Sequence, residues 1–420
     1  MLSTIAIVAG LSLVGAASVQ WAIGSYFQKG FDKRRSTRLS GDQQKHAAVL
    51  MSVRGCDPSL ENCLSGILNQ DYDSYEVHLV VDHKTDPAWD FVHQLKTQHD
   101  ERDVLTIHEM VEPLETCSLK CNSLIQAYLQ ISDSAEFVAL IDSDVSPHSQ
   151  WLADLTGPLQ DPTVGGVTGS QWFEPAALAG IGSLARSTWN SGALVLTIFF
   201  SNPWAGSFCM RRKDLDDSGL VDTWSRTAVD DGPIQTSVND LGLKIEFAPS
   251  LIMVNREACT FGYVNRWVTR MLTWSRLYES TFFLTVIHAC FSNAVMLSNF
   301  ALLFLGIATG NGTVIAISVV SLIASGVICT HSYIATRKCV QHSLGLRGET
   351  LQRLTPSRIF GVFAMISIAH LVYGVSCVRA LLLKQIKWRE ISYELNAKDN
   401  VKRLNYAPFV GSKKDEQSSI

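Results

Sequence analysis

The sequence is poor in charge and lacks the cysteine pairs that bind zinc. Only 18% of its 420 residues are charged, whereas 47% are hydrophobic, which is too apolar for an ordinary soluble protein of this length. The ten cysteines form no Cys-x-x-Cys pair, so the spacing of a zinc or thiol-redox motif is missing. The formal net charge of -4 excludes the basic balance of a nucleic-acid-binding protein. The composition therefore favours a membrane protein with reduced thiols and no nucleic-acid partner.

Charge is missing altogether from the first long segment. Leu2–Tyr26 carries no charged residue, and a helix of that length can cross a hydrocarbon core of about 30 Å. A cleaved signal peptide would carry its positive charge before the apolar run. Here the basic residues follow it, namely Lys29, Lys33, Arg34, Arg35 and Arg38. We therefore expect an N-terminal transmembrane helix over residues 1–28 whose C-terminal end is cytoplasmic.

Three further apolar segments lie near the other end of the chain. Phe282–Thr309, Thr313–Ala335 and Ile359–Val378 each contain a single histidine and no aspartate, glutamate, lysine or arginine. They predict a membrane region over residues 281–383 with about three spanning helices, followed by a polar tail over residues 384–420. Basic residues between the last two segments predict a cytoplasmic loop there.

These rules leave open which side of the membrane holds the tail. One N-terminal span and three C-terminal spans would put the tail outside. The tail nevertheless begins Lys384-Gln-Ile-Lys387-Trp-Arg389, which favours the cytoplasm. Either the last segment is re-entrant or interfacial, or the positive-inside rule fails here.

Between the apolar segments, residues 38–280 have the composition of a cytoplasmic globular domain. Predicted helices alternate with predicted strands at Ala47–Val53, Tyr75–Val81, Val104–Ile107 and Phe137–Ile141. This alternation predicts an α/β fold with a mostly parallel sheet and helices on both faces. Asp57-Pro58 predicts a capped helix start. Tyr263–Arg276, in which tryptophan and arginine are mixed, predicts an interfacial helix at the end of the domain.

Aspartates follow several of these strands. Asp142-Ser143-Asp144 ends the strand Phe137–Ile141, and carboxylates at i and i+2 point the same way in extended backbone. Ligands bind at the carboxyl ends of strands in open α/β sheets, and Mg²⁺ is typically held by one or two carboxylates plus substrate phosphates. This motif predicts a metal-bound diphosphate, although a solvated turn would carry the same residues. A second pair, Asp230-Asp231, precedes a predicted helix, where Asp230 could instead be an N-cap.

The order of these motifs resembles the family-2 processive-type glycosyltransferases of GT-A fold, and more narrowly the ceramide glucosyltransferase group. The narrower resemblance is carried by Val53-Arg-Gly-Cys-Asp57-Pro58, by Asp82-His83 running into Asp86-Pro87, and by Arg270-Met-Leu-Thr-Trp274. Trp388-Arg389 and Tyr393 also look like that group's tail. The resemblance covers residues 45–280 well and the membrane region loosely.

Position by position, the resemblance implies a donor site for a nucleotide-sugar, in particular a UDP-sugar. Asp82 would contact the uracil or ribose, and Asp142 would hold the nucleotide. Asp144 would ligate a divalent metal, Mg or Mn, on the diphosphate. Arg54 and Lys120 match basic positions near the nucleotide.

The resemblance also implies an acceptor side. Asp231 would be the catalytic base, and Asp230, Arg270 and Trp274 would bind the diphosphate or the acceptor. Thr273 departs from the family motif because it stands where a second arginine is expected.

The function implied is a multi-pass membrane enzyme with a cytoplasmic catalytic domain. It would invert the anomeric centre while moving a sugar, by resemblance glucose, to a lipid such as ceramide. One alternative is a processive polysaccharide synthase of the same fold. Another, suggested by Thr273, is a non-catalytic membrane scaffold with a decayed transferase domain.

Overall fold

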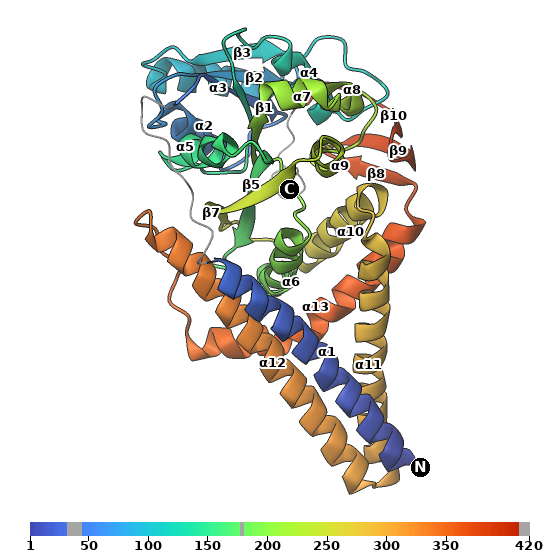
Figure 1. Ribbon diagram of the computed structural model, residues 1–420. Coiled ribbons are helices and arrows are strands. Elements are labelled where there is room, and N and C mark those ends of the chain that lie inside the picture. The colour runs from blue at the N-terminus through green and yellow to red at the C-terminus, as the bar shows by residue number, and fades with distance from the viewer. Residues whose placement is uncertain (32–43, 177–179, 411–420) are drawn as a thin grey trace. The chain divides into compact units, whose positions relative to one another are not determined.

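The computed structural model describes residues 1–31, 44–176 and 180–410 (Figure 1). These residues divide into two compact units. One unit is mainly helical and contains the long apolar helices, while the other contains both β-sheets. The basic residues Lys33, Arg34, Arg35 and Arg38, on which the predicted orientation partly rests, lie outside the described residues.

Seven strands form the main sheet in the order β3-β2-β1-β4-β6-β5-β7. Their bounds are β1 Ala47–Val53, β2 Tyr75–Val81, β3 Leu105–Glu109, β4 Phe137–Ile141, β5 Val164–Phe173, β6 Ser207–Arg211 and β7 Lys244–Asn255. Strands β1 to β4 pair in parallel, whereas β6 is antiparallel to both β4 and β5. The predicted α/β fold with a mostly parallel sheet is confirmed.

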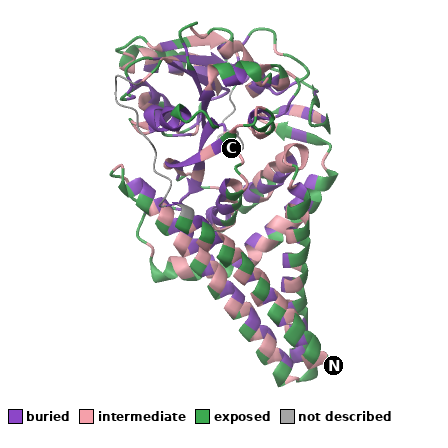
Figure 2. Cartoon of the chain, in the orientation of Figure 1, coloured by how far each residue is buried: buried purple, intermediate pink, exposed green. Residues whose placement is uncertain are grey.

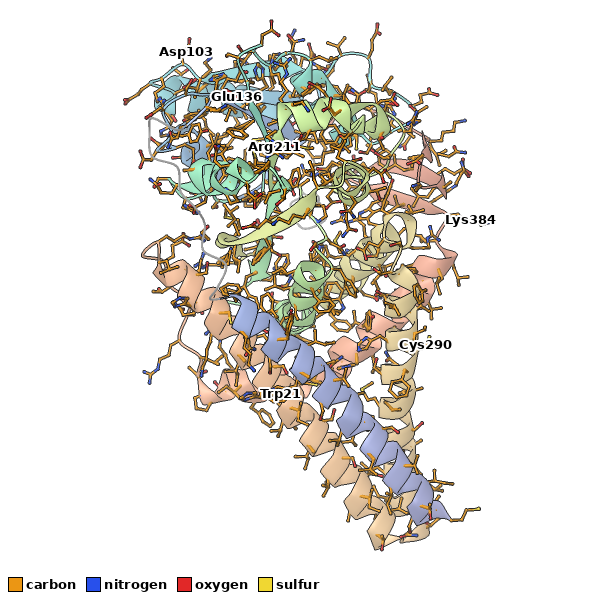
Figure 3. The ribbon with its side chains drawn as sticks, in the orientation of Figure 1. Trp21, Asp103, Glu136, Arg211, Cys290 and Lys384 are labelled. Carbon is orange, nitrogen blue, oxygen red and sulfur yellow. The ribbon has the colours of Figure 1, made fainter. Side chains whose placement is uncertain are left out.

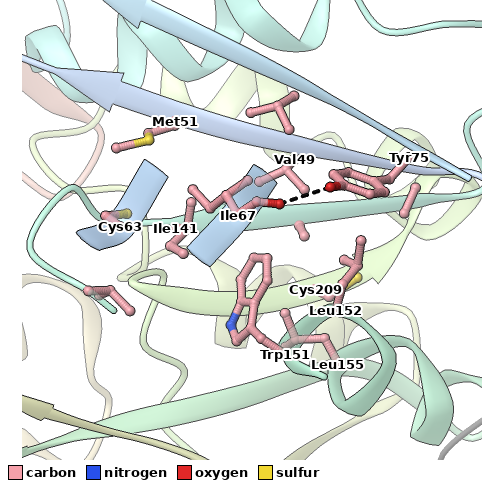
Figure 4. Packing of buried hydrophobic residues seen from close by; sticks show 14 of the residues in the cluster. Val49, Met51, Cys63, Ile67, Tyr75, Ile141, Trp151, Leu152, Leu155 and Cys209 are labelled. Carbon is pink, nitrogen blue, oxygen red and sulfur yellow. Dashed lines mark hydrogen bonds between the residues drawn. The ribbon is translucent and has the colours of Figure 1, made fainter. Parts of the chain in front are cut away.

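Helices cover both faces of the parallel part of this sheet. The helices are α2 Leu60–Leu68, α3 Pro87–His99, α4 Leu119–Tyr128 and α5 Trp151–Thr156. Alternate residues of β1, such as Val49 and Met51, share one buried cluster with α2, α3 and α5 (Figure 4). Because side chains alternate across a strand, Ala48 and Leu50 face the opposite side, and α4 packs against β1 and β2. Burial on both faces explains why these strands are continuous apolar runs.

Three short helices complete the main sheet's unit, and a small second sheet follows in the tail. The helices are α7 Arg212–Asp217, α8 Leu220–Trp224 and α9 Ile234–Asp240. The second sheet is antiparallel, in the order β10-β9-β8, with β8 Gln385–Trp388, β9 Ile391–Ala397 and β10 Asn400–Arg403. On β9 the residues Ile391, Tyr393 and Leu395 are buried in alternation. The tail, predicted only as polar, therefore contains a half-buried sheet.

The helical unit contains α1 Leu2–Phe31, α6 Ile181–Phe199, α10 Phe261–Tyr278, α11 Phe282–Thr309, α12 Gly312–Gly345 and α13 Pro356–Leu382. Among the described residues, α1, α11, α12 and α13 are long and apolar enough to cross a membrane. Much of their apolar surface is exposed to the surroundings (Figure 2), and Figure 3 shows Trp21 on α1 and Cys290 on α11 as examples. Exposure of this kind is expected where lipid covers the helix. The protein is therefore integral to a membrane.

Close helix packing in this unit depends on small residues. A Cβ atom at Gly10 of α1 would lie 2.3 Å from Oγ of Ser321 on α12. Small residues let helix backbones approach closely, as is common in membrane proteins. Asn299 of α11 also donates from Nδ2 to the carbonyl oxygen of Ala9 at 2.9 Å. Polar and small residues thus fix α1 against α11 and α12.

Candidate functional site

Several predicted site residues meet at one edge of the main sheet. Arg54 directly follows β1, Asp82 follows β2, and Asp142 and Asp144 follow β4. Since β1, β2 and β4 are parallel neighbours, their carboxyl ends meet at the edge where open α/β sheets bind ligands. We call the edge formed by residues 54–57, 82–86 and 142–144 the rim.

Lys120 joins the rim to the second acidic pair. Its Nζ lies 2.5 Å from Oδ1 of Asp142 and 2.7 Å from Oδ2 of Asp230. The side chain of Asp230 is only 3% exposed. Burial alone would lower the pKa of Lys120, but Asp142 and Asp230 outweigh it and raise that pKa. Lys120 therefore stays charged and holds two carboxylates from different parts of the chain together.

Asp230 and Asp231 have different environments although they are neighbours. Burial raises the pKa of Asp230, while the ammonium of Lys120 opposes that rise. The backbone carbonyl of Asp230 accepts from Nε1 of Trp224 at 2.9 Å, which fixes the loop. Asp231 is only partly buried. The N-cap position of α9 is Pro233, so the alternative interpretation of Asp230 as an N-cap is wrong.

Asp82 is buried beneath the end of the described chain. Its Oδ2 accepts from Nη1 of Arg54 and from the backbone N–H of Phe409, the latter at 3.2 Å. The hydroxyl of Tyr406 donates to the carbonyl oxygen of Asp82 at 3.3 Å. Burial raises the pKa of Asp82, and Arg54 lowers it. Among the described residues nothing hydrogen-bonds Oδ1 of Asp82, so one buried acceptor atom of this carboxylate has no partner.

Asp57 and Arg389 are site residues that the sequence analysis missed. Nη2 of Arg389 lies 2.6 and 2.7 Å from the two carboxylate oxygens of Asp57. Oδ2 of Asp57 also accepts from Oγ of Ser143, the middle residue of the Asp-x-Asp motif. The N-cap position of α2 is Ser59, so the interpretation of Asp57 as a helix cap is wrong. The only sequence signal for Arg389 was the resemblance of the tail.

The residues of the rim suit a divalent cation that is bound jointly by protein carboxylates and by oxygen atoms of a ligand. Three basic residues, Arg54, Lys120 and Arg389, bring positive charge to the rim. Five carboxylate side chains lie in the rim, namely Asp57, Asp82, Asp86, Asp142 and Asp144. Burial raises the pKa of the Cys63 thiol, and the negative charges of Asp144 and Asp142 raise it further. In the described part of the chain, no cluster of three or more His, Cys, Asp or Glu residues is arranged to hold a metal. A metal here would therefore need oxygens from a bound diphosphate, as Mg²⁺ commonly does.

Arg270 and Trp274 belong to the helical unit, where they lie one turn apart on α10 and are half-buried. Their binding roles remain predictions. Thr273 is fully buried, and its Oγ1 donates to the carbonyl oxygen of Thr269 at 2.8 Å. An arginine at position 273 would have to bury its charge. Trp267, also on α10, packs edge-on against Trp189 of α6.

Comparison with known proteins identifies similar sequences and folds. The sequence model of Glycosyl transferase family 21 matches residues 12–401, which confirms the prediction of a glycosyltransferase. Poly-beta-1,6-N-acetyl-D-glucosamine synthase of Staphylococcus epidermidis is 25% identical over 232 residues, which are 49% of this chain and 50% of that protein. The chain thus spans about half the length of this curated relative.

Two solved structures show a looser similarity. The mannosyltransferase of Pyrobaculum calidifontis, in complex with GDP-Man and Mn2+, is 17% identical with a TM-score of 0.49. That alignment covers 91% of this chain and 97% of the mannosyltransferase. Glucosyl-3-phosphoglycerate synthase of Mycobacterium tuberculosis is 15% identical with a TM-score of 0.36, covering 56% of this chain and 82% of the synthase.

Proposed function

Since the chain belongs to Glycosyl transferase family 21, we propose that this glycosyltransferase moves a sugar from a nucleotide-sugar to the hydroxyl of a membrane lipid. The observation that carries this proposal is the presence of the rim and of four membrane-length helices in one polypeptide. An acceptor that stays in the bilayer explains why the enzyme does too. Ceramide or a related lipid, with glucose as the sugar, is the pair that the sequence motifs favour.

The donor side of the proposed reaction uses the rim. Lys120 and Arg54 supply positive charge toward the diphosphate of a UDP-sugar, and Asp142 orients Lys120. Asp82 holds Arg54 and keeps one oxygen for the uridine. Asp144 would hold a divalent metal, Mg²⁺ or Mn²⁺, which neutralises charge on the leaving diphosphate when bound.

The acceptor side needs a single base. The lipid hydroxyl oxygen attacks the anomeric carbon on the face opposite the diphosphate, and a glycosidic C–O bond forms while the bond to the diphosphate oxygen breaks. Asp231 takes the hydroxyl proton, a role that suits a carboxylate that is partly accessible. The configuration at the anomeric carbon is inverted, and no covalent enzyme intermediate forms. Asp230 positions Lys120, and Arg270 and Trp274 would contact the acceptor or diphosphate at the membrane face.

A processive polysaccharide synthase is the second candidate. It is favoured by the 25% identity to a synthase of poly-beta-1,6-N-acetyl-D-glucosamine over half of its length. Such an enzyme would use the same donor rim but would elongate a polymer instead of glycosylating a lipid once. The two candidates therefore differ in the size of the product.

The product assay decides between these candidates. Membranes containing the protein are incubated with labelled UDP-glucose, UDP-N-acetylglucosamine or GDP-mannose, and the products are separated by size and polarity. We expect one labelled glycolipid that disappears when EDTA removes divalent metal. A polymer of high mass would establish the synthase instead. If nothing is labelled and no nucleotide diphosphate binds in the presence of metal, the chain is a scaffold and both catalytic proposals fail.

The sheet-containing unit should face the cytoplasm. Lys29 lies in the last turn of α1. Five further basic residues lie in the C-terminal part of α12, in the loop after it or in the first turn of α13, namely Arg337, Lys338, Arg347, Arg353 and Arg358. Basic residues are retained on the cytoplasmic side. We expect a protease added to intact cells to spare this unit, and one added to opened cells to degrade it. Cleavage of the unit in intact cells would reverse the proposed orientation.

A further inference from the structure

The turn between β8 and β9 has an unusual backbone. Its two residues, Arg389 and Glu390, have φ angles of 43° and 68°. Two-residue hairpin turns with positive φ at both positions favour Asn-Gly, because glycine and asparagine adopt left-handed backbone conformations more readily than residues such as arginine and glutamate. Strained residues persist where the surrounding structure fixes them, and they concentrate at functional sites. Contacts of Arg389 with the rest of the protein must therefore stabilise this turn.

Arg389 is clamped to the rim by reciprocal bonds. Its Nη1 donates to the carbonyl oxygen of Arg54, and Nε of Arg54 donates to the carbonyl oxygen of Arg389 at 3.3 Å. Its Nη2 bonds both oxygens of Asp57, at 2.6 and 2.7 Å. The side chain of Arg389 is only 9% exposed. A buried guanidinium is thus delivered from the tail to the carboxyl end of β1.

The same guanidinium is linked through Asp57 to the Asp142-Ser143-Asp144 motif. Asp57 accepts from Ser143, which lies between Asp142 and Asp144. Burial would lower the pKa of Arg389, but Asp57 and, more weakly, Asp144 raise it. Among the residues that the structure describes, nothing accepts from Nε of Arg389. A permanent cation with an unused donor therefore lies beside the residue proposed to hold the metal.

The other end of the same tail segment also touches the rim. The backbone N–H of Phe409 bonds Asp82, and the ring of Phe409 lies against Gly55, where a Cβ atom would come within 2.9 Å of it. Gly55 has a φ of 75°, so glycine is required here for both space and conformation. Residues 385–410 therefore contact the rim at the Asp82 side as well as at the Asp57 side.

We propose that Arg389 is a donor-binding residue that grips the diphosphate of the nucleotide-sugar. This proposal rests on the proposed function. The guanidinium of Arg389 adds positive charge to the rim beside Asp57 and Ser143. A guanidinium suits this task because Nη1 and Nη2 can hold it on the rim while its Nε–H is left for a phosphate oxygen, and a hydrogen bond from a charged donor to phosphate is stronger than one from a neutral donor. The positive φ angles of Arg389 and Glu390 are then the backbone strain that accompanies placing this side chain at the rim from a two-residue turn.

The test compares ligands that differ only in phosphate. The full-length protein in nanodiscs is titrated with UDP, UMP and uridine in the presence of Mn²⁺. Arg389→Gln should weaken UDP binding about 10–100-fold, as expected for loss of a charge-assisted hydrogen bond, while uridine binding stays unchanged. The KM for the donor should rise more than kcat falls.

Matched variants separate a diphosphate contact from a structural anchor. Lys387→Gln removes an exposed charge from the same hairpin and should leave UDP binding unchanged. Arg403→Gln removes an anchor of the same sheet, the 2.7 Å bond from Nη2 to the carbonyl oxygen of Pro113. It should lower Tm without a preference for diphosphate. If Arg389→Gln does not fold, Arg389→Lys keeps the charge but loses the planar fork, and should still weaken UDP binding several-fold relative to uridine.

Two results overturn the inference. One is UDP binding of wild-type strength in a folded Arg389 variant, and the other is an equal loss of UDP and uridine binding. Both leave the proposed function standing, since the wild-type protein still binds UDP. Failure of the wild-type protein to bind UDP at all would instead refute the proposed function.

Discussion

Asp231→Asn is expected to lower sugar transfer by about 10²–10⁴-fold, the contribution of a positioned general base, while UDP still binds. Asparagine has nearly the same shape but cannot accept the proton of the acceptor hydroxyl. Transfer is measured as labelled product per enzyme molecule, and UDP binding is measured by titration on the same preparation. The effect should appear in kcat, because the base acts on a complex that has already formed.

The control for this variant is Asp222→Asn. Asp222 pairs with Arg226 at 3.1 Å, and its side chain is 73% exposed. Removal of that charge should leave transfer near the wild-type rate, because exposed ion pairs contribute little. Turnover by Asp231→Asn at the wild-type rate would refute its role as the base. Loss of UDP binding in that variant would instead assign Asp231 to the donor side.

Lys120→Met is expected to destabilise the sheet-containing unit by about 3–5 kcal/mol, the usual result of leaving a buried charge without its partner. Methionine keeps the bulk of the stem but leaves Asp230 buried beside Asp142 with no cation. Unfolding by urea, followed by tryptophan fluorescence, measures the loss. Lys213→Met is the control, because Lys213 bonds Asp217 at a similar 2.8 Å on the exposed face of α7. It should unfold like the wild type.

The loss of unfolding free energy caused by Lys120→Met should become smaller as the pH is lowered. Burial raises the pKa of Asp230 even with Lys120 present, and removing the ammonium raises it further. A carboxyl whose folded pKa lies above its unfolded pKa stabilises the fold when protonated, and this contribution is lost as pH rises through the folded pKa. The variant should therefore lie closest to the wild type at mildly acidic pH. A deficit that grew on acidification would contradict the pairing.

The strands that build the rim could be predicted because each is a continuous apolar run. The ranges predicted for β1, β2 and β4 agree with those observed. The helix α6 was not predicted, because buried polar residues such as Ser183, Arg186 and Asn190 interrupt its apolar pattern. The strands of the tail were missed because their buried residues alternate with exposed or half-buried ones, so they form no continuous apolar run.

The site was predicted in part, for a physical reason. Strand ends place Asp82, Asp142 and Asp144 by a local rule. No local rule joins Asp57 to Arg389, which are 332 positions apart. Nor does sequence show which member of Asp230-Asp231 is buried, since that depends on Lys120, brought from α4. Long-range ion pairs of this kind follow from the fold and not from the pattern of residues.

The clamp between Arg54 and Arg389 also has a consequence for biosynthesis. The strands β1 to β7 leave the ribosome early, but β8 to β10 are translated only after α11, α12 and α13. Contacts between such distant segments must wait for the whole intervening chain. A nascent chain that has not yet produced its last membrane helix therefore has Asp57 without its guanidinium and Asp82 without its cover. The order of translation alone makes the completed rim the last part of the enzyme to appear.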